Sequence, residues 1–229
     1  MVDNEIVDKE IKAPKDCKKR TKELLKLTFP IMIEQSFIML MGVINTAMVA
    51  VLGAHELSAA GHLNNSSNIP IALLTATAMG GTILVAQATG AKDLNRAKKS
   101  AGQSISLALV LSLVLTLILN VFSNNVINML FPGAEYDTLS AAREYYFFII
   151  WSMPFLAIGQ TIFGVLRGSG DVKTPMFIVV LMNIINVVLS FLLIPILGIS
   201  GAGIAILASR FVGFLLSWVF ILSKKCKIR

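Results

Sequence analysis

The sequence is poor in charge and in cysteine. Charged residues make up 14% of its 229 residues, whereas about a quarter of a soluble domain is charged. This composition excludes a soluble enzyme, a nucleic-acid binder and a disordered chain. Its two cysteines, Cys17 and Cys226, have no partner at metal-site spacing and are too few for a disulfide framework. We therefore expect no metal site and no cofactor.

Long uncharged, apolar runs take the place of the missing charge. Five of them exceed the ~18–20 residues that cross the hydrocarbon core of a bilayer as a helix, and they cover 35–55, 57–91, 100–134, 145–166 and 174–209. The last of these is too long for one span, and Pro195 with the glycines that follow it divides the run. The pattern predicts an all-α integral membrane protein with six transmembrane helices, at about 28–52, 64–88, 101–122, 145–166, 174–197 and 201–223.

The basic residues indicate how these helices are oriented. All Lys and Arg residues except Arg143 and Arg210 lie in a polar N-terminal tail (1–27), in the loops after the second and fourth helices, or in a basic C-terminal tail (224–229). Basic loops favour the cytoplasmic side of a membrane. We therefore expect a multi-pass protein of the plasma membrane with both termini cytoplasmic. We attribute the net charge of +7 to basic residues that orient the helices and contact membrane lipid, and we expect no nucleic-acid partner.

Three segments resemble one transporter family, the multidrug and toxic compound extrusion (MATE) family. The second helix and its loop carry GTILVAQATGAKD at 81–93, followed by Arg96-Ala97, and the loop after the fourth helix carries LRGSGDVKTPM at 166–176. The first helix, from Phe29-Pro30 through GVINTAMV at 42–49 to Leu52-Gly53, is also similar. The motifs occur in the family's order and at its spacing across about 28–223, so the chain resembles the N-terminal six-helix lobe of a MATE transporter.

The resemblance implies a secondary antiporter, not an enzyme. Members export small organic compounds, often cations, in exchange for protons or sodium, and they have twelve helices in two lobes with the substrate path between them. Because this chain matches one lobe, it is expected to work with a second six-helix lobe. It is then a fragment, one subunit of a split transporter, or a half-transporter that forms a homodimer.

Two sets of polar residues share helix faces inside the expected spans. Glu34 and Asn45 lie on one face of the first helix, and Asn183, Asn186 and Ser190 lie on one face of the fifth. At about 1.5 Å per residue, Asn45 and Ser190 are each roughly 10 Å from the outer ends of their helices. The two faces are therefore expected to meet in the outer half of the lobe, and we predict that these five residues line a substrate and cation pathway.

The resemblance also raises a question about ion coupling. Family members commonly carry acids at the positions of Asn45 and Ser190, with an asparagine matching Asn186. An amide and a hydroxyl form hydrogen bonds but do not exchange a proton near neutral pH. Coupling then depends on acids in a second lobe, or on Glu34, or the chain binds without transporting.

Arg210 and Glu34 are the two ionisable residues inside the expected spans, and such residues are functional candidates by default. Arg210 is expected to pair with a carboxylate or with backbone carbonyls, and Glu34 is the candidate partner. Two other functions stay open from the sequence. One is a truncated or interaction subunit that does not transport, and the other is a flippase for lipid-linked precursors from the same superfamily.

Overall fold

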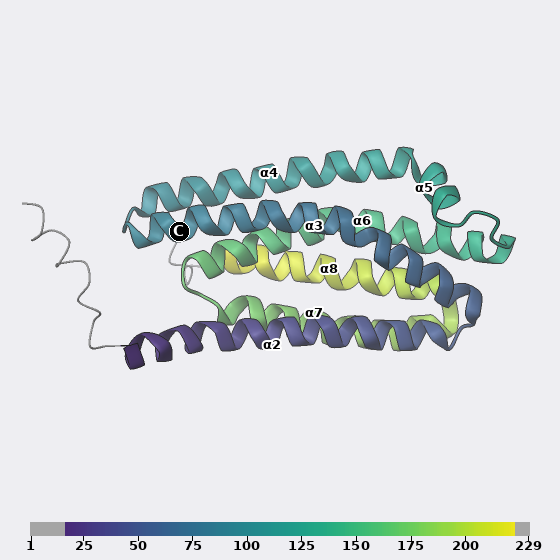
Figure 1. The fold of residues 1–229 in the computed structure, drawn as a ribbon, viewed down its shortest axis with the longest axis horizontal. Helices are drawn as coiled ribbons and strands as arrows, with labels where there is room; N and C mark the ends of the chain where they lie inside the picture. Colours follow the sequence, from purple (N-terminus) through teal and green to yellow (C-terminus); the bar gives the residue numbers. More distant parts are fainter. Residues whose placement is uncertain (1–16, 223–229) are drawn as a thin grey trace, which may run out of the picture.

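The computed structural model describes residues 17–222, and within this range the chain is entirely helical or in short turns (Figure 1). The expected tails therefore fall largely outside the described residues, as 1–16 and 223–229. The helices are α2 (Cys17–Ala50), α3 (Ala54–Gly90), α4 (Leu94–Val121), α5 (Ser123–Leu130), α6 (Tyr136–Gly168), α7 (Lys173–Leu197) and α8 (Ile199–Leu222).

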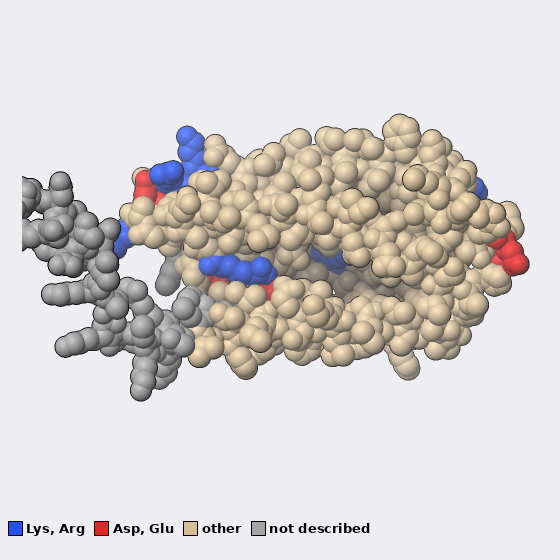
Figure 2. Space-filling view, viewed as in Figure 1, with Lys and Arg blue, Asp and Glu red and all other residues tan. Residues whose placement is uncertain are grey.

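Six of these helices are long and apolar enough to cross a membrane: α2 from Thr28 onward, α3, α4, α6, α7 and α8. The predicted all-α architecture with six spans is confirmed. Figure 2 shows what such a protein needs on its surface, because uncharged side chains cover the middle of this face and charged ones gather mainly near its ends. The apolar middle matches the hydrocarbon core, where charges are costly.

Four helices begin earlier than the apolar runs indicated. α2 begins at Cys17 instead of 28, α3 at Ala54 instead of 64, α4 at Leu94 instead of 101, and α6 at Tyr136 instead of 145. Backbone hydrogen bonding continues a helix through charged residues beyond the apolar run, as it does at 94–99 of α4 and 136–144 of α6. α3 has 37 residues. The stretch 123–144, which separates the predicted third and fourth spans, contains the short helix α5 and the first turns of α6.

The two loop motifs carry aspartates that begin the next helix. Before α4, the Asp93 side chain accepts a hydrogen bond from the Arg96 amide at 2.9 Å. Before α7, the Asp171 carboxylate accepts from the Thr174 amide at 3.1 Å and from its hydroxyl at 2.7 Å. These bonds satisfy amides that have no partner within the helix, as capping residues do. Between α7 and α8 no aspartate is used, and Gly198 turns the chain with a φ of +59°, a conformation that favours glycine.

α6 is the central helix of the bundle. In its most apolar 18-residue stretch 78% of the residues are buried, against 11–28% in the other five spans. α6 packs against α3, α8 and α4, while α7 packs against α8 and α2. α2 therefore lies at the margin of the bundle, beside α7 (Figure 1).

Small residues let α6 and α3 approach closely. A Cβ on Gly168 would lie 2.8 Å from the Thr82 carbonyl oxygen, and one on Gly164 would collide with the Thr82 side chain. Close backbone approach of this kind is a main source of helix association in lipid, where the hydrophobic effect between helices is absent. Gly81–Gly90, part of the second-helix motif, includes this contact surface.

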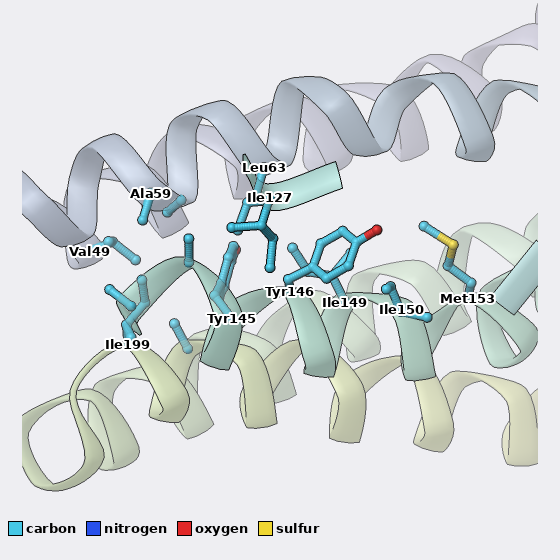
Figure 3. Close-up of a cluster of buried hydrophobic side chains, with 14 of the residues drawn as sticks. Val49, Ala59, Leu63, Ile127, Tyr145, Tyr146, Ile149, Ile150, Met153 and Ile199 are labelled. Carbon is cyan, nitrogen blue, oxygen red and sulfur yellow. The ribbon is translucent and has the colours of Figure 1, made fainter. Parts of the chain in front are cut away.

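The core sits where α6 meets α3 and α5. Figure 3 shows Tyr145, Ile149 and Met153 of α6 in one cluster with Leu63 of α3 and Ile127 of α5. All five are at most 3% exposed. This packing holds α3 and α6 in fixed register at one end of the bundle, and both helices contribute to the cavity described next.

The turns alternate between the two ends of the bundle. In Figure 1 the start of α2, the α3–α4 turn and the α6–α7 turn lie at the left-hand end, and the α2–α3, α5–α6 and α7–α8 connections lie at the right-hand end. The loops that carry the basic residues thus share one end, as the orientation argument requires.

Candidate functional site

A cavity of about 520 Å³ lies among α2, α3, α6, α7 and α8. Its volume falls within the ~300–1,000 Å³ of typical ligand sites. Part of its wall is apolar and aromatic, and includes Ile38, Met41, Phe155, Met182 and Phe214. Figure 2 shows the molecule hollowed between α2 and α3, with blue basic atoms inside the hollow.

The structure brings three of the five predicted pathway residues to this cavity. Asn45 of α2 and Asn183 and Asn186 of α7 line it. Ser190 is 2% exposed and is not among the residues that line the wall, and neither is Glu34. The two predicted faces therefore meet at the cavity through Asn45, Asn183 and Asn186, without Glu34 or Ser190.

Asn186 carries unused hydrogen-bonding capacity. It is 5% exposed, and its Nδ2 donates to the Ser209 hydroxyl of α8 at 3.2 Å. Its Oδ1 is buried without a partner among the described residues, as is the Nδ2 of Asn183. Buried polar groups are normally paired, so one unpaired acceptor and one unpaired donor at a cavity wall are groups that a ligand or water can satisfy.

Sequence reasoning missed the polar wall that α3 and α6 supply. Asn64, Ser67 and Asn68 of α3 line the cavity together with Tyr145 and Gln160 of α6. The Tyr145 hydroxyl donates to Asn64 Oδ1 at 3.3 Å. A signal existed, because Asn64, Ser67 and Asn68 have the i, i+3, i+4 spacing of one helix face. The spacing was not interpreted as a site because the second helix was predicted to begin at 64, which placed these residues in its first turns.

Arg210 of α8 is the charged residue in the wall. Its Nη1 donates to the Ser152 hydroxyl of α6 at 2.6 Å, and its side chain faces the cavity. Among the described residues, no Asp, Glu or Lys lines this space. The cavity is thus a partly apolar chamber with several amides and a single formal charge, which is positive.

Glu34 has a different partner from the one predicted. It forms an ion pair with Arg167, at the end of α6, and not with Arg210. One carboxylate oxygen, Oε1, accepts from Arg167 Nη2, while Oε2 has no partner among the described residues. The predicted pair of Glu34 and Arg210 is wrong, because the Glu34 carboxylate pairs with Arg167 and the Arg210 guanidinium donates to Ser152. The ion pair ties the marginal helix α2 to the end of α6.

Comparisons with known proteins agree with the motifs. The family model MatE matches residues 30–192. The chain is 33% identical to the "Probable multidrug resistance protein NorM" of Thermotoga maritima (strain ATCC 43589 / DSM 3109 / JCM 10099 / NBRC 100826 / MSB8), over 84% of this chain and 42% of that protein. It is 26% identical to the "Uncharacterized transporter YisQ" of Bacillus subtilis (strain 168), over 96% of this chain and 48% of that protein.

Solved structures show the same half-length match. A MATE crystallised in complex with MaL6 superposes with a TM-score of 0.85 at 26% identity, over 90% of this chain and 46% of that one. A transporter of the MOP superfamily from Pyrococcus furiosus Vc1 (DSM3638), described as having a binding pocket of reversed polarity that suggests a different function, superposes with a TM-score of 0.80 at 28% identity, over 90% and 45%.

The fold and the cavity identify the class of protein: a multi-pass, helical membrane protein with a chamber between its helices. The chain belongs to the MatE family of transporters. It spans about half the length of the curated relatives and solved transporters that it matches.

Proposed function

We propose that the chain is one lobe of a secondary active efflux transporter that exports small organic compounds in exchange for protons or sodium. The cavity carries this proposal. Its volume, aromatic surface and unpaired amide groups suit a small organic molecule, and it lies among helices that cross the membrane. Organic cations are the substrates that the family resemblance implies, although the charged side chain in the cavity wall, Arg210, is itself positive.

A second six-helix lobe completes the transporter in this proposal. The chain matches less than half of each full-length relative above, and its cavity opens between α2 and α3 (Figure 2). A second copy of the chain or a separate lobe would supply the opposite wall of the substrate path, and rocking of the two lobes would expose the path to each side in turn. Both termini lie on the cytoplasmic side of the plasma membrane in this arrangement, as the basic loops indicate.

Ion coupling in this lobe is assigned to Glu34. Asn45 and Ser190 are neutral where the family commonly has acids, whereas Glu34 is a carboxylate within a span and is 0% exposed. Its pairing with Arg167 gives it two states that differ in charge, one paired and one protonated. A carboxylate that releases Arg167 when it takes up a proton would loosen the contact between α2 and the end of α6.

Uptake into inverted membrane vesicles tests the proposal. Vesicles that contain the chain, or a covalent tandem of two copies, are given a proton or sodium gradient and a panel of cationic and anionic fluorescent dyes. We expect gradient-dependent uptake of at least one dye. Asn186→Ala should lower this uptake because Asn186 lines the cavity, and Asn124→Ala, an exposed asparagine of α5, is the matched control.

The mass of the purified detergent complex is measured on the same protein. A dimer that transports indicates a homodimer, and a monomer that transports only as the tandem indicates that two linked copies of this lobe form a working transporter. Absence of gradient-dependent uptake from both proteins for every dye would contradict transport by two copies of this chain, and absence of uptake when a second six-helix lobe is supplied as well would contradict the proposed function. Cysteine labelling that placed the start of α2 and residues 91–93 on opposite sides of the membrane would contradict the proposed topology.

A further inference from the structure

We propose that this cavity binds an amphipathic organic anion, whose carboxylate, sulfonate or phosphate group pairs with Arg210. The inference rests on the proposed function in one respect, which is that the cavity is the substrate path. It replaces the cation implied by the family resemblance with a substrate of the opposite charge.

The charge of the wall is the first argument. Arg210 lines the cavity, and among the described residues no acidic side chain does so. A guanidinium stays protonated at any physiological pH, and a charge held inside a membrane protein is costly unless an opposite charge or hydrogen-bond acceptors offset it. An organic cation would add a second positive charge to this space, whereas an anion would neutralise the one already there.

The acids of neighbouring helices do not supply that neutralisation. The buried carboxylate of Glu34 already pairs with Arg167. Glu144 of α6 is exposed and accepts a hydrogen bond from Ser200 at 2.6 Å. Within the described residues, Arg210 therefore has no carboxylate partner of its own.

The hydrogen bonding of Arg210 is the second argument. Ser152 accepts from Nη1 at 2.6 Å, which fixes the guanidinium against α6. The remaining N–H groups of Arg210 donate to none of the described residues. A planar guanidinium with one side anchored and the other open matches the two oxygens of a carboxylate or phosphate, which accept two parallel hydrogen bonds from arginine.

The rest of the wall suits the rest of such a molecule. Phe155 and Phe214 line the cavity with ring centroids 5.7 Å apart, and they offer an aromatic surface for an apolar body. The Asn183 Nδ2 is buried without an acceptor among the described residues, so it can donate to a second oxygen of the ligand. A molecule with an acidic group at one end and an aromatic or aliphatic body can pair with Arg210, pack against the two phenylalanines and accept a hydrogen bond from Asn183.

A pair of dyes with a common ring system tests the charge preference directly. The full chain is purified into nanodiscs of phosphatidylcholine, and binding of anionic fluorescein and cationic rhodamine 123 is measured by fluorescence anisotropy. We expect fluorescein to bind more tightly than rhodamine 123. Tighter binding of rhodamine 123 would overturn the proposal, and this comparison on the unaltered chain requires no variant to fold.

Three variants then assign the preference to Arg210. Arg210→Gln should weaken fluorescein binding about ten-fold or more, since hydrogen bonds to a charged group are lost, and should leave rhodamine 123 binding unchanged or tighter. Arg210→Lys, which keeps the charge, should retain most of the preference. Arg143→Gln, at an exposed arginine of α6 outside the cavity, should change neither dye. Equal weakening of both dyes in Arg210→Gln would show a merely structural role and overturn the proposal.

The anionic group can come from a dissolved organic acid or from a lipid headgroup. Repeating the titration in nanodiscs that contain phosphatidylglycerol separates these sources. A large loss of fluorescein binding by the unaltered chain, together with a smaller loss by Arg210→Gln, supports a lipid anion that pairs with Arg210. Unchanged fluorescein binding by the unaltered chain supports a dissolved acid.

The binding experiment and the transport experiment fail independently. Nanodisc binding needs no gradient and no second lobe, so anion binding without uptake would contradict the proposed efflux function and leave the charge preference standing. Uptake of cationic dyes together with weak fluorescein binding would contradict the charge preference and leave the proposed efflux function standing.

Discussion

Two arginines lie near the membrane interior of this bundle, and their surroundings differ. Arg167, at the end of α6, pairs with the fully buried Glu34 of α2. Arg210, in α8, has a serine hydroxyl as its partner among the described residues and faces a cavity. The first charge is neutralised within the protein and connects two helices. The second is held in position but not neutralised, which is the arrangement that leaves a charge available to a ligand.

The comparison shows that the number of ionisable residues in a span says little about their role. A buried pair contributes to structure because removing either member leaves the other uncompensated. A buried charge with room beside it is able to bind a ligand, which is the role proposed above for Arg210. The partner and the adjacent space, and not the residue type, separate the two cases here.

Arg167→Leu should have the largest effect. It leaves the Glu34 carboxylate buried and without its cation, and breaking such a pair costs about 3–5 kcal/mol in measured cases. We expect the unfolding free energy in detergent to decrease by an amount near the lower end of that range, because the Arg167 side chain is 22% exposed. Arg143→Leu, at an exposed position, is the control. Equal unfolding temperatures for the two variants would remove the structural role assigned to the pair.

Glu34→Gln should cost less, about 1–2 kcal/mol of unfolding free energy, because its amide oxygen still accepts a hydrogen bond from Arg167 but without the charge. Combined with Arg167→Leu it should cost less than the sum of the single variants, which a double-mutant cycle measures. In vesicles, Glu34→Gln should also abolish the proton dependence of uptake. Uptake with unchanged rate and proton dependence would exclude Glu34 as the coupling acid.

Asn45→Asp places an acid in the cavity that contains Arg210, at a position where the family resemblance implies one. The added negative charge should lower fluorescein affinity and raise rhodamine 123 affinity, each by at least about three- to ten-fold, since two unit charges 4 Å apart interact by about 1 kcal/mol even in water. Anisotropy titrations in nanodiscs measure both. An increase in fluorescein affinity would be inconsistent with Arg210 and Asn45 sharing one ligand space.

Ser152→Ala should have the smallest effect. It removes the hydroxyl that accepts from Arg210 at 2.6 Å, and we expect a loss of about 1 kcal/mol of unfolding free energy. Anion binding should weaken only a few-fold because the charge remains. If Ser152→Ala abolished fluorescein binding as fully as Arg210→Gln, orientation and not charge would be the dominant requirement. Ser104→Ala, at a buried serine of α4 outside the cavity, is the matched control.

The sequence alone was sufficient to predict the six spans and the family. Uncharged runs mark spans because no water in the bilayer satisfies a charge, and this holds whatever the neighbouring helices do. The break at Gly198 was also accessible, since Pro195 and the following glycines interrupt an apolar run too long for one helix. Charged helix extensions such as 94–99 were missed because hydropathy marks where lipid ends, which is not where a helix ends.

The site was only partly predictable. Asn45, Asn183 and Asn186 were identified because helical spacing places residues on a face. The partner of Glu34 was not, because spacing within one helix does not say which other helix lies beside it, or at what height. The prediction paired Glu34 with Arg210, the other ionisable residue in a span, and overlooked Arg167, which lies one residue beyond the end of the predicted span 145–166.

The length of α3 has a consequence for experiments on sidedness. Its 37 residues measure roughly 55 Å as a helix. Even at a tilt of about 40°, near the upper limit seen for transmembrane helices, it would extend roughly 42 Å along the bilayer normal, well beyond a hydrocarbon layer of about 30 Å. Both tips of this helix therefore emerge among the headgroups, where water-soluble reagents that cannot penetrate lipid are able to reach Gly53 from one compartment and Lys92 from the other.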